Sequence, residues 1–455
     1  MKRKQKALEK ILSVLPLEVF AIVEVFRQEG FQCFPVGGAL RDILLERPVV
    51  DFDLTTDATP SQVMKLFPKV IPTGIDHGTV TLIGKEHKYE ITTFRTEENY
   101  SDHRHPDSVS FSSSIEEDLS RRDFTINALA VDLLNKELID LFNGLEDIED
   151  RIIRTIGDPD KRFTEDALRM MRFCRFASVL KFKTDNSSFE AVKRNAHLID
   201  KISKERVRDE LVKILLSVQP STGLELLRRA GLMERIIPEL LEGFGIEQNR
   251  FHRYDIYEHN IKTCDAASRL TEDLSVRMAA LLHDIGKSRT INKAEGKENT
   301  FYNHEITGAI LAKEILKRLK FSNQFIDKVF LLIKNHMFHY TKDWSDAAVR
   351  RFMRKTEMIM DELFILREAD RIGSGKKSGD SKILAELKEK IEQERKKESA
   401  FKLKDLALDG NDVMRILNIP PSPKVGEILN SLLESVLEDP SLNTKEKLEE
   451  LIKKM

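Results

Sequence analysis

The pattern of apolar and polar positions changes near residue 140. Before that point, short apolar stretches, several of them alternating with period two, are typical of strands. The predicted strands are residues 31–36, 49–54, 79–83, 89–94 and 130–134. Beyond Asp147 almost every segment has the apolar period and the capping residues of a helix. The pattern predicts an α+β head followed by an all-helical remainder.

Two polar, glycine-containing stretches interrupt the helical part. They span residues 243–253 and 373–379, and they bracket a unit of their own. A chain of 455 residues is also too long for one hydrophobic core. We therefore predict four domains, namely a head (1–146), a helical neck and body (147–244), a third domain (245–375) and a helical tail (376–455).

The composition is that of a globular protein. With 33% charged and 41% hydrophobic residues, the chain can bury a sizeable core. No stretch approaches the roughly 20 apolar residues of a membrane span, and the basic N-terminal segment lacks the apolar core of a signal peptide. The three cysteines are far apart, which argues against a disulfide framework. We expect a cytoplasmic protein without membrane association.

A pair of glycines stands where a predicted strand meets a predicted helix. Gly37 and Gly38 follow the strand at residues 31–36 and open a helical pattern over residues 39–45. Backbone at such a turn can approach a triphosphate closely, and the helix N-terminus points N–H groups at it. Because a glycine pair is often only a turn, the prediction of a phosphate site depends on the aspartates that follow.

Asp51 and Asp53 lie on one face of the predicted strand at residues 49–54. Two neighbouring carboxylates repel each other unless a cation lies between them, and Mg²⁺ prefers such oxygen ligands. Two magnesium ions would activate an attacking 3′-hydroxyl and neutralise a pyrophosphate leaving group. An Asx-turn pair on an exposed loop is the alternative. The proximity to the glycine turn favours a catalytic metal site at Asp51 and Asp53.

A charged motif on the helical pattern of residues 164–180 predicts base recognition. Asp166 and Arg169 are three apart and share a helix face, which Arg172 and Arg175 continue. Cytosine and adenine present an amino donor beside a ring acceptor, and uracil and guanine present the reverse. An aspartate that accepts and an arginine that donates can therefore select C and A. The alternative is a salt bridge on a solvated helix.

These motifs, together with residues 121–128 and 157–159, occur in the order of a known family. The chain resembles the class II tRNA nucleotidyltransferases, which include CCA-adding enzymes and bacterial poly(A) polymerases. The likeness to the CCA-adding members extends to the tail motif at residues 408–412. It implies a polymerase-β-like head, a small mixed sheet with helices, followed by an all-α neck, body, HD domain and tail.

The resemblance also implies residue roles in the head. Asp51 and Asp53 would hold magnesium, and Glu90 is a candidate for a third carboxylate. The residues that would bind the nucleotide are Gly37, Gly38, Arg41, Arg122, Asp123, Asn127, Asp166, Arg169, Arg172 and Arg175.

The predicted domain at residues 245–375 carries a second set of metal-binding side chains. Their order along the chain resembles that of HD phosphohydrolases, which implies one metal at His259, His283, Asp284 and Asp370 and a second at His304 and His336. Imidazoles and carboxylates suit Mn, Fe, Co, Ni or Mg rather than a structural zinc. Such a site could hydrolyse phosphomonoesters or 2′,3′-cyclic phosphates. A decayed domain with satisfied core histidines is the alternative, although no ligand position is missing.

The charge pattern bears on RNA binding. The formal net charge is only −2, but residues 151–235 contain 19 Lys and Arg against 12 Asp and Glu. This surplus indicates an RNA surface on the neck and body, with a solvated helical surface as the alternative. The polar stretch at residues 100–107 is a candidate lid or lever, or a plain connector. In the family that the chain resembles, enzymes that add A keep a flexible loop here.

Together these features predict template-independent addition of CCA to the 3′ end of tRNA from CTP and ATP. An active HD domain would add a phosphohydrolase for the repair of RNA ends. The alternatives within the family are an A-adding tRNA nucleotidyltransferase and a bacterial poly(A) polymerase, although the chain has no long polybasic tail. An HD phosphohydrolase whose head binds RNA without catalysis is the alternative of another class.

Overall fold

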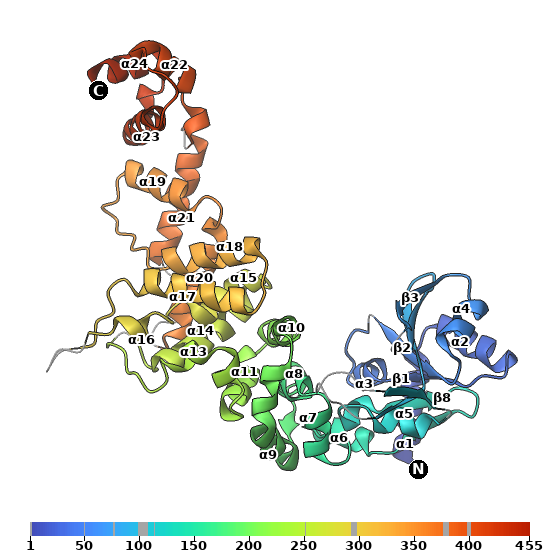
Figure 1. Cartoon of the computed structure of the whole chain (residues 1–455). Helices are drawn as coiled ribbons and strands as arrows, with labels where there is room; N and C mark the ends of the chain where they lie inside the picture. Colours follow the sequence, from blue (N-terminus) through green and yellow to red (C-terminus); the bar gives the residue numbers. More distant parts are fainter. Residues whose placement is uncertain are drawn as a thin grey trace. The chain divides into compact units, whose positions relative to one another are not determined.

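The computed structural model describes residues 2–49, 51–75, 78–98, 108–112, 114–250, 252–292, 298–375, 382–397 and 402–455. Its contacts divide the chain into two units, Met1–Pro238 and Glu239–Met455, which are coloured from blue to green and from green to red in Figure 1. The predicted loop at residues 100–107 lies outside the described residues, and the finer division into four domains stays a prediction.

A seven-stranded mixed sheet forms the centre of the head, in the order β3-β4-β5-β2-β1-β8-β9. The strands are β1 (Cys33–Val36), β2 (Phe52–Thr56), β3 (Val70–Gly74), β4 (Thr79–Ile83), β5 (Lys88–Thr93), β8 (Leu129–Asp132) and β9 (Glu137–Asp140). β2 and β5 pair in parallel, and the other neighbours are antiparallel. The small mixed sheet of the predicted α+β head is confirmed.

All five predicted strands form, within a few residues of their expected bounds. The pattern missed β3 and β9 at the two edges of the sheet, and the separate hairpin of β6 (Arg95–Glu98) and β7 (Ser108–Phe111). An edge strand is paired on one side only and buries few side chains, so its apolar alternation is weak. In β3, no side chain is fully buried.

Helices complete the head. They are α1 (Lys2–Val14), α2 (Leu17–Gln28), α3 (Gly38–Leu44), α4 (Pro60–Leu66), α5 (Ile115–Ser120) and α6 (Gly144–Asp150). α3 follows β1 after one residue, close to the predicted helix at 39–45, and Leu40 on it is fully buried. Phe34 and Val36 of β1 pack with Leu119 of α5 in a common hydrophobic core. This packing fixes the glycine turn at the end of β1.

The rest of the first unit is helical apart from a two-residue pairing of β10 (Ile152–Ile153) with β11 (Lys183–Thr184). The helices are α7 (Pro159–Glu165), α8 (Leu168–Leu180), α9 (Asn186–Asn195), α10 (Lys204–Leu215), α11 (Pro220–Arg229) and α12 (Met233–Ile236). α8 lies at the centre and packs against α7, α10 and α11.

The continuous helix predicted over residues 164–180 is wrong. α7 ends at Glu165, and Asp166 has an extended backbone, with φ −134° and ψ 104°. Its side chain accepts a hydrogen bond from the Leu168 N–H at 3.1 Å, so it caps the start of α8. Aspartate favours this local bond over a helix interior, and the chain breaks between two helices at the residue expected to read the base.

The second unit is helical throughout its named elements. They are α13 (Pro238–Leu241), which begins at the boundary, α14 (Ile256–Leu270), α15 (Leu274–Leu282), α16 (Lys287–Thr290), α17 (His304–Arg318), α18 (Asn323–Asn335), α19 (Asp346–Thr356), α20 (Met360–Gly373), α21 (Lys382–Lys396), α22 (Gly410–Leu417), α23 (Pro423–Glu438) and α24 (Lys445–Lys454). None of the described helices combines the length and the apolar character needed to cross a membrane.

Two packing features organise this unit. α14 lies against α20 so closely that a Cβ on Gly373 would stand 2.2 Å from the Thr263 hydroxyl. The last three helices enclose their own core, in which Leu432, Leu437 and Leu448 are fully buried. The all-helical architecture predicted for the third domain and the tail is confirmed.

Candidate active sites

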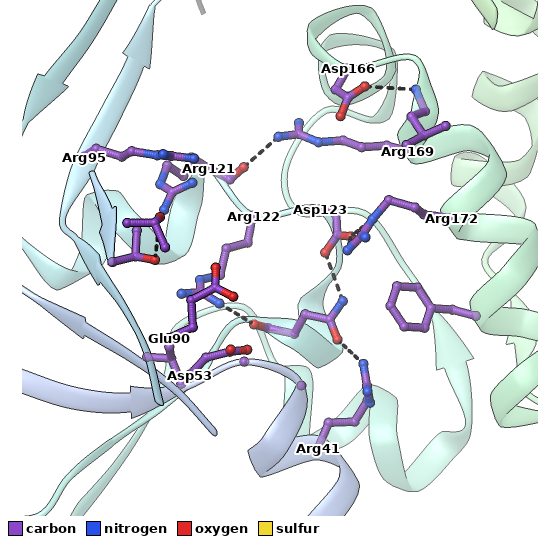
Figure 2. Close-up of a pocket in the computed structure, with 18 of the residues that line it drawn as sticks. Arg41, Asp53, Glu90, Arg95, Arg121, Arg122, Asp123, Asp166, Arg169 and Arg172 are labelled. Atoms are coloured by element: carbon purple, nitrogen blue, oxygen red, sulfur yellow. Dashed lines mark hydrogen bonds and ion pairs between the residues drawn. The ribbon is translucent and has the colours of Figure 1, made fainter. Parts of the chain in front are cut away.

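A cavity of about 630 Å³ lies in the first unit, between the head sheet and the start of α8 (Figure 2). Its lining includes all ten residues predicted to bind the nucleotide, which are Gly37, Gly38, Arg41, Arg122, Asp123, Asn127, Asp166, Arg169, Arg172 and Arg175. Asp53 and Glu90 line it as well. Asp51 is exposed and comes directly before β2, outside the residues that line the cavity.

Carboxylates gather where β2 and β5 run side by side. The parallel register places Asp53 directly opposite Glu90, and both point to the same side in Figure 2. Burial raises the pKa of Asp53 to about 6, and the Glu90 and Asp51 carboxylates add to the rise while Arg122 opposes it. Such a group of oxygen donors fits Mg²⁺. The register therefore supplies a structural reason to include Glu90 with Asp51 and Asp53.

The glycine turn brings backbone close to this group. Gly37 has φ +79°, and a Cβ there would stand 3.0 Å from a guanidinium nitrogen of Arg122 and 3.3 Å from Asp53 Oδ2. A larger residue would be strained and would displace both side chains. The Gly37 N–H already donates to the Leu129 carbonyl at 3.1 Å, so it is not one of the N–H groups that could meet a phosphate.

A buried carboxylate that the sequence analysis missed holds two of the arginines. Asp118 of α5 is fully buried, and its two oxygens lie 2.6 Å from Arg121 and 3.2 Å from Arg122. Burial alone would raise the pKa of Asp118, but the two guanidinium groups outweigh it and the pKa lies below its usual value. The i,i+3 and i,i+4 spacing to the arginines was the available signal.

A second buried carboxylate connects the glycine turn to α8. The Arg172 guanidinium donates to Asp123 Oδ2 from two nitrogens, at 2.8 and 2.6 Å. The Asn127 amide donates to Asp123 Oδ1 at 3.0 Å, and its own oxygen accepts from Arg41 at 2.5 Å. Dashed lines in Figure 2 mark hydrogen bonds at Asp123 and at Arg41. Asp123 and Asn127 thus orient the two arginines.

Phe176 of α8 carries a cluster of cations on the wall of the same cavity. The guanidinium of Arg175 lies 4.0 Å from its ring centre, and those of Arg41 and Arg172 lie at 5.1 and 5.5 Å. An aromatic ring attracts cations to its face. The three guanidinium groups are therefore concentrated at one wall, where Arg172 also pairs with Asp123, Arg175 with Glu210 and Arg41 with Asp42.

The two predicted base-reading residues, Asp166 and Arg169, both line the cavity, but they form their salt bridges with other residues. Arg169 donates to Glu165 at 2.8 Å and to the Arg121 carbonyl at 3.0 Å. Asp166 instead pairs with Arg206 of α10, at 2.9 and 3.4 Å. Arg206 is 40 residues away along the chain, and no local pattern connects it to Asp166.

The second unit brings the six predicted HD residues together. Asp284 is the centre of the group, because each of its oxygens faces two imidazoles. Oδ2 lies 3.3 Å from Nε2 of both His259 and His283. Oδ1 lies 3.3 Å from Nε2 of His304 and 3.6 Å from Nε2 of His336. All five side chains are buried. This arrangement makes two candidate metal sites that share one carboxylate.

The histidine rings are oriented as metal ligands usually are. Nδ1 of His283, His304 and His336 contacts the carbonyl three residues earlier, at 3.0, 2.7 and 2.7 Å. A donating Nδ1–H leaves Nε2 as the ligand atom. Among the described residues, Nε2 of His304 and of His336 has no hydrogen-bond partner although it is buried. A divalent cation would satisfy both atoms, and the imidazole and carboxylate set fits Mn, Fe, Co, Ni or Mg.

The sixth residue, Asp370 of α20, completes the first of these sites. Its Oδ1 lies 3.2 Å from Nε2 of His259, and its Oδ2 accepts from Arg367 at 2.8 Å. A cavity of about 510 Å³ opens onto the group. The lining also contains cationic residues that were not predicted as site residues, among them Lys287 and Arg371.

Comparisons with known proteins agree with this architecture. Residues 33–154 match the poly A polymerase head domain, residues 181–243 the probable RNA and SrmB-binding site of polymerase A, and residues 256–374 the HD domain. The chain is 32% identical over 452 residues to a CCA-adding enzyme of Enterococcus faecalis, covering 97% of this chain and 98% of that protein. It is 34% identical over 432 residues to one from Lactiplantibacillus plantarum, covering 94% of each chain.

A solved structure extends the likeness to three dimensions. The Bacillus stearothermophilus CCA-adding enzyme in complex with CTP is 30% identical, with a TM-score of 0.73 over 96% of both chains. The match therefore extends over almost the whole of both chains. The chain belongs to the family of class II CCA-adding enzymes.

Proposed function

We propose that the protein adds CCA to the 3′ end of tRNA from CTP and ATP, without a nucleic-acid template. The observation that carries the proposal is a cavity of the first unit whose lining brings together a carboxylate group, several arginines and both predicted base-reading residues. The transfer of a nucleotide from a nucleoside triphosphate requires carboxylates for the metal ions, cations for the phosphates and polar groups for the base. The family supports the same reaction, and its solved member from Bacillus stearothermophilus binds CTP.

In this proposal Asp51, Asp53 and Glu90 hold magnesium. Bound magnesium supplies charge neutralisation for the leaving pyrophosphate and activates the attacking 3′-hydroxyl. Arg122, held by Asp118, and Arg41, held by Asn127, bind phosphate oxygens. Because these guanidinium groups are already fixed by buried partners, they lose little conformational entropy when the nucleotide binds.

The base is selected on the other side of the cavity. Asp166 accepts a hydrogen from the exocyclic amino group of cytosine or adenine, and Arg169 donates to the adjacent ring nitrogen. Uracil and guanine would place a carbonyl oxygen against the carboxylate, and two acceptors cannot bond. The same pair of residues thus admits both CTP and ATP.

The deciding experiment offers tRNAs that end before CCA, after C and after CC, each with CTP and ATP supplied separately. Addition of C to the first two and of a single A to the third supports CCA addition. An enzyme restricted to the third substrate would be an A-adding enzyme, and long A tails would indicate a poly(A) polymerase.

For the second unit we propose a metal-dependent phosphohydrolase that repairs RNA ends. The observation that favours it is the shared Asp284 carboxylate between two pairs of buried imidazoles. The Nε2 atoms of two of these imidazoles, His304 and His336, accept or donate no hydrogen bond within the part of the chain that the structure describes. Divalent cations bound there would activate water for attack on a phosphate. The test is hydrolysis of p-nitrophenyl phosphate and of a 2′,3′-cyclic nucleotide after loading with Ni²⁺ or Mn²⁺.

We further propose a cytoplasmic location. Cys33, Cys174 and Cys264 are buried free thiols, as expected of a protein from a reducing compartment. Cell fractionation with an antibody to the protein would test it.

A further inference from the structure

The carboxylate of Asp166 lies outside any helix and is held from a distant element. The backbone around it is extended, between the end of α7 and the start of α8. A side chain on such a junction has more rotational freedom than one in a helix interior. A base-reading carboxylate at this position therefore needs a partner that fixes its direction.

Arg206 is that partner. It projects from α10, which packs against α8, and it lines the same cavity as Asp166. Its Nη2 lies 2.9 Å from Asp166 Oδ2 and its Nη1 lies 3.4 Å from Oδ1. A guanidinium that contacts both oxygens of a carboxylate fixes the plane of that carboxylate as well as its position. Both side chains are mostly buried, with 28% and 17% of their surfaces exposed.

The hydrogen bonds of Asp166 leave room for one more donor. Oδ1 accepts from the Leu168 N–H at 3.1 Å and from Arg206. Oδ2 accepts from Arg206 at 2.9 Å. A carboxylate oxygen can accept two hydrogens, so Oδ2 keeps a direction in which the amino group of cytosine or adenine can donate.

We propose that Arg206 is a specificity-determining positioning residue, which holds Asp166 in the orientation that reads the exocyclic amino group. The proposal rests on the base-reading role of Asp166 given above. Arg169 has separate anchors in Glu165 and the Arg121 carbonyl. Loss of Arg206 therefore disturbs the reading of the amino group and leaves the reading of the ring nitrogen in place.

The test compares Arg206→Met and Arg206→Lys with Arg208→Met. Arg208 is a matched control on the same helix, where it pairs with Asp209. Single-turnover incorporation of CTP, UTP, ATP and GTP is measured on tRNAs ending before CCA and after CC. We expect Arg206→Met to lower the preference for CTP over UTP, and for ATP over GTP, at least tenfold. Arg206→Lys should retain part of this preference, and Arg208→Met should keep the wild-type ratios.

A double variant separates positioning from a general structural role. If Arg206 acts through Asp166, then adding Arg206→Met to Asp166→Ala changes the selectivity no further. A uniform loss of rate for all four nucleotides, with unchanged ratios, would overturn the proposal. If Arg206→Met does not fold, the test rests on the CTP/UTP and ATP/GTP ratios of Arg206→Lys, because that variant keeps the charge and most of the volume. A wild-type protein that incorporates neither CTP nor ATP would refute the proposed function instead.

Discussion

Arg172 donates two hydrogen bonds to one carboxylate oxygen of Asp123, at 2.8 and 2.6 Å, although the two residues are 49 positions apart. Asp123 is buried, and its other oxygen accepts from Asn127, which in turn binds Arg41. One buried anion therefore orients an arginine of α8 and, through an amide, an arginine of α3. Asp123 thus connects the phosphate side of the cavity with the base side.

The Asp123–Arg172 pair should make the stability of the protein depend on pH. Burial raises the pKa of Asp123, but Arg172 and Asn127 outweigh it and the folded pKa is about 2. An unfolded aspartate titrates near ~3.9, so the folded pKa is depressed. The carboxylate stabilises the fold fully above about pH 4, and this stabilisation is lost as the pH falls toward 2.

We expect Asp123→Asn to lower the free energy of unfolding by roughly 2–3 kcal/mol at pH 7, from the size of that pKa shift. The difference from the wild type should shrink at pH 3, because the wild type is then losing the same charge. Urea unfolding at both pH values measures it. A difference that is equal at pH 7 and pH 3 would show that the ionised carboxylate is not the cause.

The two candidate sites should act independently. Asp53→Ala should abolish nucleotide addition, a loss of several kcal/mol of transition-state stabilisation, and should spare hydrolysis of p-nitrophenyl phosphate with Ni²⁺ or Mn²⁺. His283→Ala should do the reverse. Each variant serves as the control for the other, provided that circular dichroism shows both to be folded. Loss of both activities in either folded variant would contradict the two-site proposal.

The amount of bound metal should show whether Asp284 is a ligand of both candidate metal sites. Its two oxygens face different pairs of imidazoles, so Asp284→Asn should reduce bound Mn²⁺ at both sites. His336→Ala should reduce it at one. Elemental analysis after dialysis against Mn²⁺ measures the stoichiometry, with His339→Ala, on the lining of the cavity but outside the group, as the control. An undiminished metal content in Asp284→Asn would refute the shared ligand.

Base choice should depend on Asp166. Asp166→Ala leaves the amino group of the incoming base without its acceptor in a desolvated site, at a cost of roughly 1–3 kcal/mol. Incorporation of CTP and ATP should slow, and discrimination against UTP and GTP should fall. Asp160→Ala is a suitable control, because that carboxylate lies at the start of α7 and pairs with Arg194. Slower incorporation with unchanged discrimination would exclude a base-reading role.

The stretch at residues 100–107 can be tested by shortening it. If it helps the pocket adjust to a larger base, the shortened protein should still add both C residues and should add the final A slowly. The measurement is A addition to a tRNA ending in CC, relative to C addition on shorter tRNAs. Equal impairment of both steps would make the stretch a plain connector.

Local patterns in the sequence determined much of the architecture. The alternation of side chains along a strand identified β2 with Asp53 on it, and helical periodicity identified the second unit. Asp51 was predicted on the same strand, but β2 begins one residue after it. The order of His259, His283, Asp284 and Asp370 was enough to predict an HD domain, which the comparisons confirm. Such features depend on neighbours within a few residues, and backbone geometry alone fixes which of them share a face.

Only the tertiary structure decided which distant side chains meet. The parallel register sets Glu90 opposite Asp53, which is the structural reason to propose it as a third carboxylate. The predicted helix over residues 164–180 broke because the Asp166 carboxylate caps α8, and its partner Arg206 comes from α10. Contacts of this kind require the chain to close long loops, and many pairings satisfy the same local pattern. The packing of α8 against α10 and the pairing of β2 with β5 select one of these possible pairings. No local pattern in the sequence indicates which one is selected.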